Sequence, residues 1–247
     1  MKVIVNGAAG RMGKVVLRLL AEGYRGASFA GGIDAFSEDD AIVKTPSALN
    51  ATGDVIIDFS SHLATKDICD YAVKTATPIV ICTTGHTDEE LAVIQKTAER
   101  VPVFHSANMS LGVALLCELA RQASALYPDA DIEIVETHHN RKLDAPSGTA
   151  LMIADRIRET REDAVYKLGR AGHEKRDRRE IGIHAVRMGN VVGEHEVRIG
   201  TDTETITLKH EAHDRSLFAE GALAAADFLI GKGAGLYDMK SMIGESV

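Results

Sequence analysis

The first half of the chain alternates short apolar runs with longer amphipathic stretches. Most of the apolar runs are rich in Val and Ile, and such runs predict buried β-strands. They cover residues 2–6, 29–33, 54–59, 78–82 and 101–105. Between them, apolar positions recur every three or four residues over 62–75 and 88–100, which predicts helices. Strands separated by helices of this length favour an α/β fold with a Rossmann-type, doubly wound parallel sheet.

The second half has a different pattern. A helix is predicted over about 111–126, then a strand at 131–137 and a helix at 149–159. Three strand-like segments follow at 181–188, 191–199 and 205–211, and the last predicted helix, 217–230, has an alanine-rich face. Gly189–Asn190 is a hairpin signal between the first two of these strands. This region therefore predicts an antiparallel or mixed sheet rather than further strand–helix–strand units.

Composition narrows the class of protein. The chain has 247 residues, of which 45% are hydrophobic, enough for one large domain or two modest ones with a true core. A formal charge of −8 disfavours a general role on nucleic acid or anionic membranes. Its three cysteines lie far apart, which suggests a reducing compartment. The N-terminus predicts a strand rather than a signal peptide, and no apolar stretch approaches the roughly 20 residues of a membrane helix, so we expect a cytoplasmic protein.

The N-terminal strand leads into a glycine turn. Lys2–Asn6 is followed by G-A-A-G-R-M-G, and an apolar helical pattern then continues through Leu20. Strand, glycine turn and helix together are typical of the entry to a dinucleotide-binding unit. The middle glycine, Gly10, comes one residue later than in the usual G-x-G-x-x-G, and a tight turn without a ligand is the alternative. Asp34 ends the second strand, where an acidic residue can accept hydrogen bonds from an adenosine ribose.

Polar loops of small residues follow several predicted strands. In a doubly wound sheet, ligands bind beyond the carboxyl ends of the strands. Those ends are the Gly7 turn, Asp34, Thr83–Thr84 and Ser106–Met109. Each could be only a loop, but together they predict a dinucleotide crevice.

The most informative segment runs from Glu136 to Ala150 and reads E-T-H-H-N-R-K-L-D-A-P-S-G-T-A. Histidine is readily poised to donate a proton near neutral pH, and Lys142 offers a compact positive charge to a carboxylate. The predicted helix start at Gly148–Thr149 is a second site for an anion. Together these features predict a pocket that binds an acidic small molecule and protonates it.

Other interpretations of single features stay open. A lone histidine or lysine is most often solvated, and the His138–His139 pair could belong to a metal site, although no convincing further ligands lie nearby. Ser147–Thr149 could be only an N-cap and a turn. The basic run Lys175–Arg179, inside the charged segment 155–180, could contact phosphate, but interleaved acids favour a solvated loop.

Several motifs are similar to those of the dihydrodipicolinate reductase family, also called 4-hydroxy-tetrahydrodipicolinate reductases. The resemblance runs over nearly the full length. The G-x-x-G-R-M-G turn, the T-T-G at Thr83–Gly85 and the segment Ser106–Gly112 resemble family motifs. The run from Glu136 matches the family signature E-x-H-H-x-x-K-x-D-A-P-S-G-T-A, and Gly182–His195 resembles the family's substrate-domain sheet.

The resemblance implies a reaction and a site. The enzyme would reduce the cyclic imine dicarboxylate to tetrahydrodipicolinate with NAD(P)H, in lysine and diaminopimelate biosynthesis. His138 would donate the proton, and Lys142 would assist that step and bind a carboxylate. The substrate would also be held by His139, Gly148 and Thr149. No metal is implied. The cofactor would be lined by Gly7, Ala8, Ala9, Gly10, Arg11, Met12, Asp34, Cys82, Thr83, Thr84, Ser106, Ala107, Asn108 and Met109, with Cys82 contributing only its backbone.

The resemblance also implies domains and an assembly. Residues 1–109 and 215–247 would form the dinucleotide-binding domain, and 110–214 an α+β domain with an open mixed sheet for substrate binding and tetramerisation. Two alternatives remain. A different nicotinamide enzyme, such as an imine or amino-acid dehydrogenase, would explain the N-terminal half but not the signature. A non-enzymatic cofactor sensor with a decayed pocket would not explain why the signature is intact.

The residues after the second strand predict cofactor choice. Asp34 can accept from the ribose 2′-hydroxyl of NADH, but its charge repels a 2′-phosphate. Ala35 stands where some relatives have an arginine that neutralises the phosphate. Arg11 and Lys14 on the glycine turn could partly compensate. We therefore expect NADH to be preferred and NADPH to be accepted as well.

Overall fold

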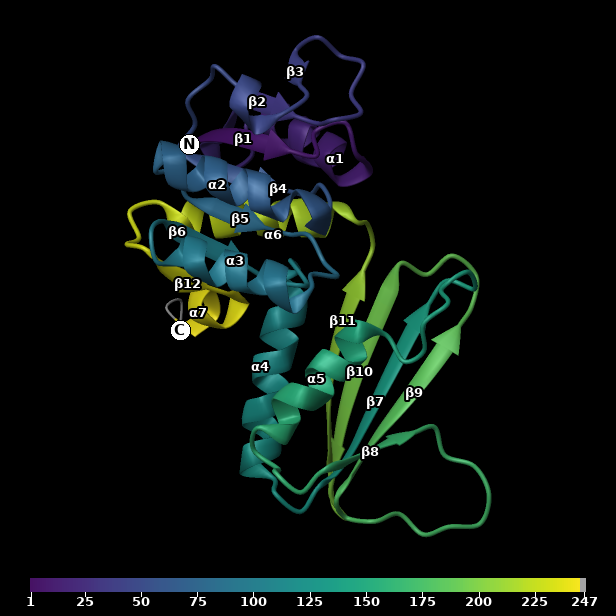
Figure 1. Ribbon diagram of the computed structural model, residues 1–247. Helices are drawn as coiled ribbons and strands as arrows, with labels where there is room; N and C mark the ends of the chain where they lie inside the picture. The colour runs from purple at the N-terminus through teal and green to yellow at the C-terminus, as the bar shows by residue number, and fades with distance from the viewer. Residues whose placement is uncertain (245–247) are drawn as a thin grey trace. The chain divides into compact units, whose positions relative to one another are not determined.

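The computed structural model describes residues 1–244 and divides the chain into two compact units (Figure 1). The first unit comprises Met1–Ser110 and the chain from Ser216 onward, and the second comprises Leu111–Arg215. The last three residues of the predicted 215–247 segment lie outside the described part. Among the described residues, no helix has the length and apolar character needed to cross a membrane.

The first unit is built on a parallel sheet. Within the described residues it has seven strands in the order β12-β6-β5-β4-β1-β2-β3. The strands are β1 (Lys2–Asn6), β2 (Ser28–Ile33), β3 (Ile42–Val43), β4 (Val55–Asp58), β5 (Ile79–Ile81), β6 (Pro102–His105) and β12 (Gly235–Tyr237). The order changes direction between β1 and β4, which is where a doubly wound sheet binds its ligand. The predicted parallel, doubly wound sheet is confirmed.

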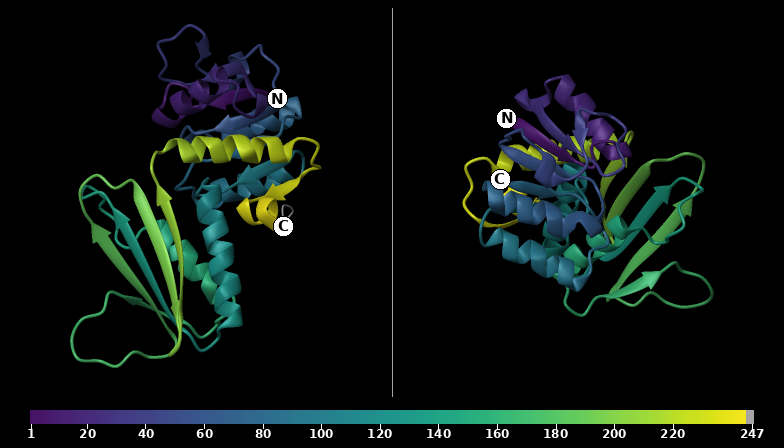
Figure 2. Two further views of the ribbon diagram at one scale, coloured as in Figure 1. Left: turned by 180° about the vertical axis from the view of Figure 1, so that it is seen from behind. Right: turned by 45° about the horizontal axis from the view of Figure 1, so that its top comes forward.

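Helices cover both faces of this sheet (Figures 1 and 2). On one face lie α2 (Thr65–Thr75) and α3 (Asp88–Ala98), and on the other α1 (Arg11–Ala21) and α6 (Ser216–Leu229). A short helix, α7 (Met239–Gly244), follows β12, and single 3-10 turns occur at Tyr24–Gly26, Pro46–Ala48 and His62–Ala64. The branched side chains of the central strands are fully buried between these layers, as Ile56 and Ile79 illustrate. This burial on both faces explains why the strand sequences are continuously apolar.

The second unit has a mixed sheet, as predicted. In the described residues its order is β11-β10-β7-β9-β8, with β10 antiparallel to β7 and β11, and β9 parallel to β7 and β8. The strands are β7 (Asp131–His138), β8 (Val165–Leu168), β9 (Glu180–Arg187), β10 (Gly193–Gly200) and β11 (Thr205–Ala212). Two helices, α4 (Leu111–Leu126) and α5 (Gly148–Arg158), pack against each other beside the sheet. Ile153 and Ile157 of α5 share a buried cluster with Ile132 and Ile134 of β7.

The hairpin predicted at Gly189–Asn190 is wrong. The two strands that it joins, β9 and β10, do not pair with each other, because β7 lies between them. The turn instead passes the end of β7, where Asn140 N–H donates to Gly189 O (3.2 Å) and Arg141 donates to Asn190 Oδ1 (2.5 Å). The local signal was correct for a turn, but long-range pairing with β7 decided the strand order.

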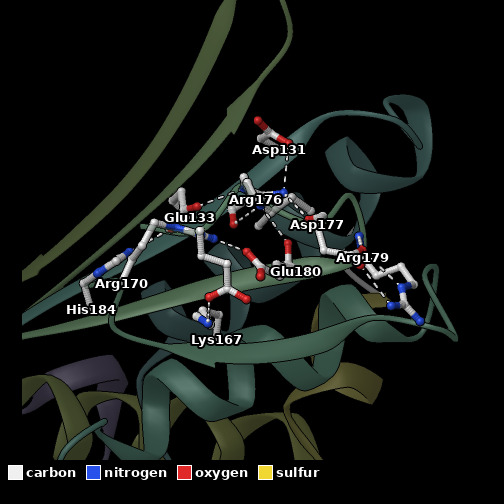
Figure 3. Close-up of polar contacts among 11 residues, drawn as sticks. Asp131, Glu133, Lys167, Arg170, Arg176, Asp177, Arg179, Glu180 and His184 are labelled. Carbon is white, nitrogen blue, oxygen red and sulfur yellow. Dashed lines mark hydrogen bonds and ion pairs between the residues drawn. The ribbon is translucent and has the colours of Figure 1, made fainter. Parts of the chain in front are cut away.

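The charged segment before β9 is anchored to the sheet (Figure 3). Residues 169–179 form a loop, as predicted, but β8 just before it was not predicted. Arg176 pairs with Asp131 (2.8 Å) and Glu133 (3.1 Å) and donates to the carbonyl oxygen of Ile132 (3.0 Å). Arg170 pairs with Glu180. These contacts with β7 and β9 give the arginines a structural role within the unit.

Candidate active site

The glycine turn of the first unit is closely packed. Gly7 has a left-handed backbone (φ +78°), and its N–H donates to Ile33 O of β2 (2.8 Å). A Cβ at Gly13 would overlap the carbonyl oxygen of Gly7 and lie 2.8 Å from Ala8 Cα. Only glycine allows this approach between α1 and the turn.

A buried carboxylic acid supports the turn from β4. Asp58 accepts hydrogen bonds from Asn6 Nδ2 (2.9 Å), Ser60 N–H (3.0 Å) and Ser60 Oγ (2.6 Å). Burial raises the pKa of Asp58, and these hydrogen bonds act in the opposite direction. The network joins the carboxyl ends of β1 and β4, directly before the turn. Sequence reasoning missed it, since Asn6 lies 52 positions from Asp58.

Asp34 lies at the carboxyl end of β2, as predicted, and it already contacts the turn. One carboxylate oxygen accepts from Ala9 N–H (3.0 Å) and the other from Phe36 N–H (2.9 Å). The carboxylate is therefore held in one orientation beside the glycine turn. The next residues, Ala35 and Phe36, are exposed and bring no positive charge.

The other predicted cofactor residues follow β5 and β6. Thr83 is buried, and its hydroxyl lies 3.0 Å from His86 Nε2, whereas Thr84 is exposed. The Ser106 hydroxyl donates to Asn108 O (2.8 Å), which shapes the loop after β6. Burial raises the pKa of the Cys82 thiol well above its usual value, so this side chain is an uncharged core group.

The geometry of this unit fits a dinucleotide. Parallel strands place the Gly7 turn, Asp34 and the loops after β5 and β6 at one edge of the sheet. Helix α1 begins at Arg11 behind Gly10, which has no side chain to cap it. The first N–H groups of a helix lack partners within the helix and carry a partial positive charge, which suits a pyrophosphate.

In the second unit, β7 presents Glu136 and His138 on the same face of the sheet, two positions apart. The Glu136 side chain is fully buried and accepts His138 Nδ1 at 2.6 Å. It also accepts Ser147 N–H (3.0 Å) and both terminal nitrogens of Arg187 (2.7 Å each). Burial alone would raise the pKa of Glu136, but the hydrogen bonds from Arg187 and His138 hold it below its usual value. Glu136 is therefore a carboxylate.

This carboxylate fixes the orientation of the His138 ring. Because Nδ1 contacts Glu136, Nε2 is the nitrogen turned to the other side, and a Cβ at Gly193 would lie 3.0 Å from it. The His138 side chain keeps 12% of its surface exposed, so a small molecule can reach it. His195 stacks edge-on at 5.2 Å between ring centroids, and burial lowers its pKa to about 4. Its neutral ring adds no competing charge beside His138.

The segment after β7 turns back sharply. Lys142 N–H donates to His139 O (3.1 Å), and the Lys142 ammonium pairs with Asp144 (2.9 Å). Burial lowers the pKa of His139, with help from Arg141 and Arg215 nearby, so His139 acts as a neutral polar group. Lys142 is thus held close to the His138–His139 strand end while part of its side chain remains exposed.

Helix α5 starts beside this turn. Ser147 caps it by accepting from Ala150 N–H (3.2 Å) and lies 3.0 Å from His195 Nε2. Gly148 is exposed, and a Cβ there would have no atom within 4 Å, so nothing covers this position of the helix start. The structure thus gathers His138, Lys142 and the start of α5 at one end of the second unit.

Three further residues of this site were not predicted. Glu136 was quoted in the signature, but no role was given to it, and Arg187 and His195 lie on β9 and β10. The pairing of β7 with β9 and β10 brings them to Glu136 and His138. Their only sequence signal was the stretch Gly182–His195. Among residues 1–244, no group of three or more potential ligands is arranged to hold a metal ion.

Comparison with known proteins identifies the family. The family model for the dihydrodipicolinate reductase N-terminus matches residues 1–109, and the model for the C-terminus matches residues 112–243. The chain belongs to the dihydrodipicolinate reductase family. A 4-hydroxy-tetrahydrodipicolinate reductase of Clostridium novyi (strain NT) is 43% identical, with 98% of each chain covered. A relative of the same name from Caldanaerobacter subterraneus subsp. tengcongensis is 44% identical, again over 98% of each chain.

A solved structure supports the fold. The dipicolinate-bound dihydrodipicolinate reductase from Paenisporosarcina sp. TG-14 matches with a TM-score of 0.81 at 24% identity, covering 98% of this chain and 99% of that chain. At this identity the likeness establishes the architecture alone. The family assignment itself confirms the resemblance found in the sequence motifs.

Proposed function

We propose that this chain reduces the cyclic imine dicarboxylate, dihydrodipicolinate or its 4-hydroxy-tetrahydro form, to tetrahydrodipicolinate with NAD(P)H, as a step of lysine and diaminopimelate biosynthesis. Family membership and relatives that carry this name over 98% of their length support it. The observation that carries the proposal is the Glu136-held imidazole of His138 beside Lys142 and the start of α5. This arrangement combines a proton donor with two sites for carboxylates.

Residues of the chain would donate the proton that the reduction needs. When bound, the reduced nicotinamide supplies a hydride, so the substrate needs one proton to complete a two-electron reduction. His138 would deliver that proton from Nε2, since Nδ1 is engaged by Glu136. The carboxylate of Glu136 would stabilise the protonated ring before transfer and keep it in place afterwards. Electrons and protons then balance for dihydrodipicolinate, with the cofactor oxidised and the substrate reduced. From the 4-hydroxy form, the 4-hydroxyl must also leave as one molecule of water.

Substrate binding would rest on the same end of the second unit. One substrate carboxylate would pair with Lys142, which would leave Asp144 for it, and the other would bind at the start of α5 around Gly148 and Thr149. His139, a neutral polar group, would contribute a hydrogen bond. Lys142 would also stabilise charge that develops during proton transfer.

The first unit would bind the dinucleotide. The pyrophosphate would lie on the turn from Gly7 to Met12, the ribose at Asp34, and the nicotinamide half at the loops after β5 and β6. We assign dinucleotide binding to residues 1–109 and 215–247, and substrate binding and tetramerisation to residues 110–214. The assembly would be a homotetramer. The chain would be located in the cytoplasm, a reducing compartment that its three buried, unpaired cysteines favour.

Removing the Lys142 ammonium should damage both catalysis and binding. In Lys142→Ala we expect kcat to fall and KM for the dicarboxylate to rise, each by about tenfold or more, because one group performs two tasks. In Thr149→Val the effect should fall mainly on KM. Steady-state kinetics with a saturating cofactor measures both. Unchanged substrate constants in Lys142→Ala would contradict the carboxylate assignment.

Cofactor preference should follow from Asp34. Its fixed carboxylate can accept from a ribose 2′-hydroxyl, whereas a 2′-phosphate would meet a like charge without an adjacent arginine. We expect a lower KM for NADH than for NADPH in one buffer. Asp34→Asn should narrow the difference, because it removes the repulsion. A clear preference of the wild-type chain for NADPH would contradict this argument.

The function is tested by cofactor oxidation. Purified chain, reduced nicotinamide cofactor and enzymatically generated substrate are combined, and loss of the reduced cofactor's absorbance is followed. We expect oxidation that depends on both chain and substrate. Absence of oxidation with either cofactor would remove the proposed function.

A further inference from the structure

We propose that Arg187 is a positioning residue of this reaction. It holds the proton donor His138 and the carboxylate-binding Lys142 in one connected array of hydrogen bonds and ion pairs, whose members are Arg187, Glu136, His138, Asp144 and Lys142. Arg187 ends β9 and lies directly opposite His138 in the parallel register of β7 and β9. The inference rests on the proposed function for the roles of His138 and Lys142, but the array itself is a feature of the structure.

One side of the array leads to the proton donor. Both terminal nitrogens of Arg187 donate to Glu136, at 2.7 Å each, and Glu136 holds His138 Nδ1 at 2.6 Å. The Glu136 side chain is fully buried, so its charge requires a partner. Arg187 supplies it, and a hydrogen bond to Glu136 raises the pKa of the guanidinium in turn. A bidentate contact of this kind fixes the carboxylate in a plane, and the ring of His138 follows.

The other side leads to the lysine. The nitrogen Nη2 of Arg187 also donates to the backbone oxygen of Asp144 (2.7 Å), and the Asp144 carboxylate pairs with Lys142 (2.9 Å). Asp144 is exposed and belongs to the loop between β7 and α5, which is also held by hydrogen bonds of Asn140, Arg141 and Ser147. Arg187 therefore ties this loop to the sheet and, before substrate binds, places the Asp144 carboxylate that holds Lys142 near His138.

Arg176 provides a comparison, because its ion pairs lie away from the residues proposed to act in the reaction. Arg176, in the same unit, has a similar exposure (18% against 19% for Arg187) and also joins carboxylates to backbone oxygens (Figure 3). Its partners, however, are Asp131 and Glu133 at the far end of β7 from His138. Arg176 is thus a matched control for Arg187. Of the two arginines, only Arg187 contacts the partners of His138 and Lys142.

The test compares substitutions of these two arginines. Arg187→Met should lower kcat on the order of 10²-fold, since misplacing catalytic groups by about 1 Å has that effect, and cofactor KM should stay unchanged. Arg187→Lys should recover part of kcat, because a single charge still compensates Glu136. Arg176→Met should lower the melting temperature with kcat near the wild-type value. Equal kcat in Arg187→Met and wild type, or a rise in substrate KM alone, would overturn the positioning role.

A double substitution separates positioning from folding. Arg187→Met leaves the buried Glu136 uncompensated, so the variant is expected to melt earlier. Adding Glu136→Gln removes that charge and should restore part of the melting temperature while kcat stays low. Because both residues act on His138 through one array, the double variant should be no slower than the slower single variant. Fully additive losses in log kcat would contradict a shared array.

Proton NMR tests the array independently of activity. The Nδ1–H of His138, in its short hydrogen bond to Glu136, should give a downfield resonance that His138→Gln removes. We expect Arg187→Met to shift or broaden this signal and Arg176→Met to leave it in place. A chain that keeps this pattern but oxidises no cofactor would refute the proposed function and retain the array. An active chain whose signal is insensitive to Arg187→Met would refute the array alone.

Discussion

Replacing His138 with Gln is expected to lower turnover by about 10²–10⁴-fold, the usual contribution of a general acid. The ring is held by Glu136 at 2.6 Å with Nε2 turned toward Gly193, and glutamine can fill some of this space but cannot deliver a proton near neutral pH. Cofactor affinity should hardly change, because the residues assigned to cofactor binding belong to the other unit. Stopped-flow or steady-state oxidation of reduced cofactor measures the first quantity, and fluorescence titration of the cofactor measures the second.

His184→Gln is the matched control for that variant. His184 lies on β9 of the same unit, and its Nε2 is paired with Glu133 (2.8 Å), so it also has a carboxylate partner. Losing this partner should cost some stability and leave kcat close to the wild-type value. If His138→Gln turned over as fast as the control, His138 would have no part in the mechanism.

Substituting Gly13 with Ala is expected to weaken dinucleotide binding by about tenfold or more. The added Cβ would overlap the backbone of Gly7 and Ala8, which cannot yield as a flexible side chain can, so the turn must move. Overpacking of this kind costs about 1–3 kcal/mol or more. Each 1.4 kcal/mol that the shift removes from cofactor binding weakens affinity about tenfold. Isothermal titration with NADH should therefore show affinity reduced by about tenfold or more, together with a lower melting temperature.

Gly233→Ala serves as the comparison in the same unit. Gly233 follows α6, and a Cβ there would have no atom within 4 Å. This variant should bind NADH as the wild type does. Normal affinity in Gly13→Ala would show that the close packing between α1 and the turn is not needed for the dinucleotide.

Much of the fold could be predicted because burial leaves a simple pattern. Parallel strands covered on both faces give continuous apolar runs, and β1, β4 and β5 were found in this way. The strands that escaped prediction, β3, β8 and β12, have two to four residues, too few for a periodic pattern. The Gly189–Asn190 turn was recognised but misread as a hairpin, since only the tertiary structure shows that β7 lies between the strands it joins.

Part of the candidate site could likewise be predicted from the sequence, and part could not. His138, Lys142 and Gly148 lie within 11 positions of one another, so a local motif sufficed to find them. Arg187 and His195 are 49 and 57 positions from His138 and join it through strand register, which sequence spacing alone does not reveal. A sequence motif also does not show which of its side chains are buried. Burial makes the charge of Glu136 depend on Arg187 and keeps His195 neutral. Arg187 and His195 therefore belong to the site although they lie outside the 136–150 motif.

Transfer of a deuterium label tests the central claim most directly. Cofactor carrying deuterium at its transferable position is incubated with the chain and enzymatically generated substrate, and the product is analysed by mass spectrometry. The proposed reduction predicts tetrahydrodipicolinate with one carbon-bound deuterium, formed in step with cofactor oxidation and greatly slowed in His138→Gln. Oxidation of the cofactor without label in the dicarboxylate, or an unreduced dicarboxylate after long incubation, would contradict the account.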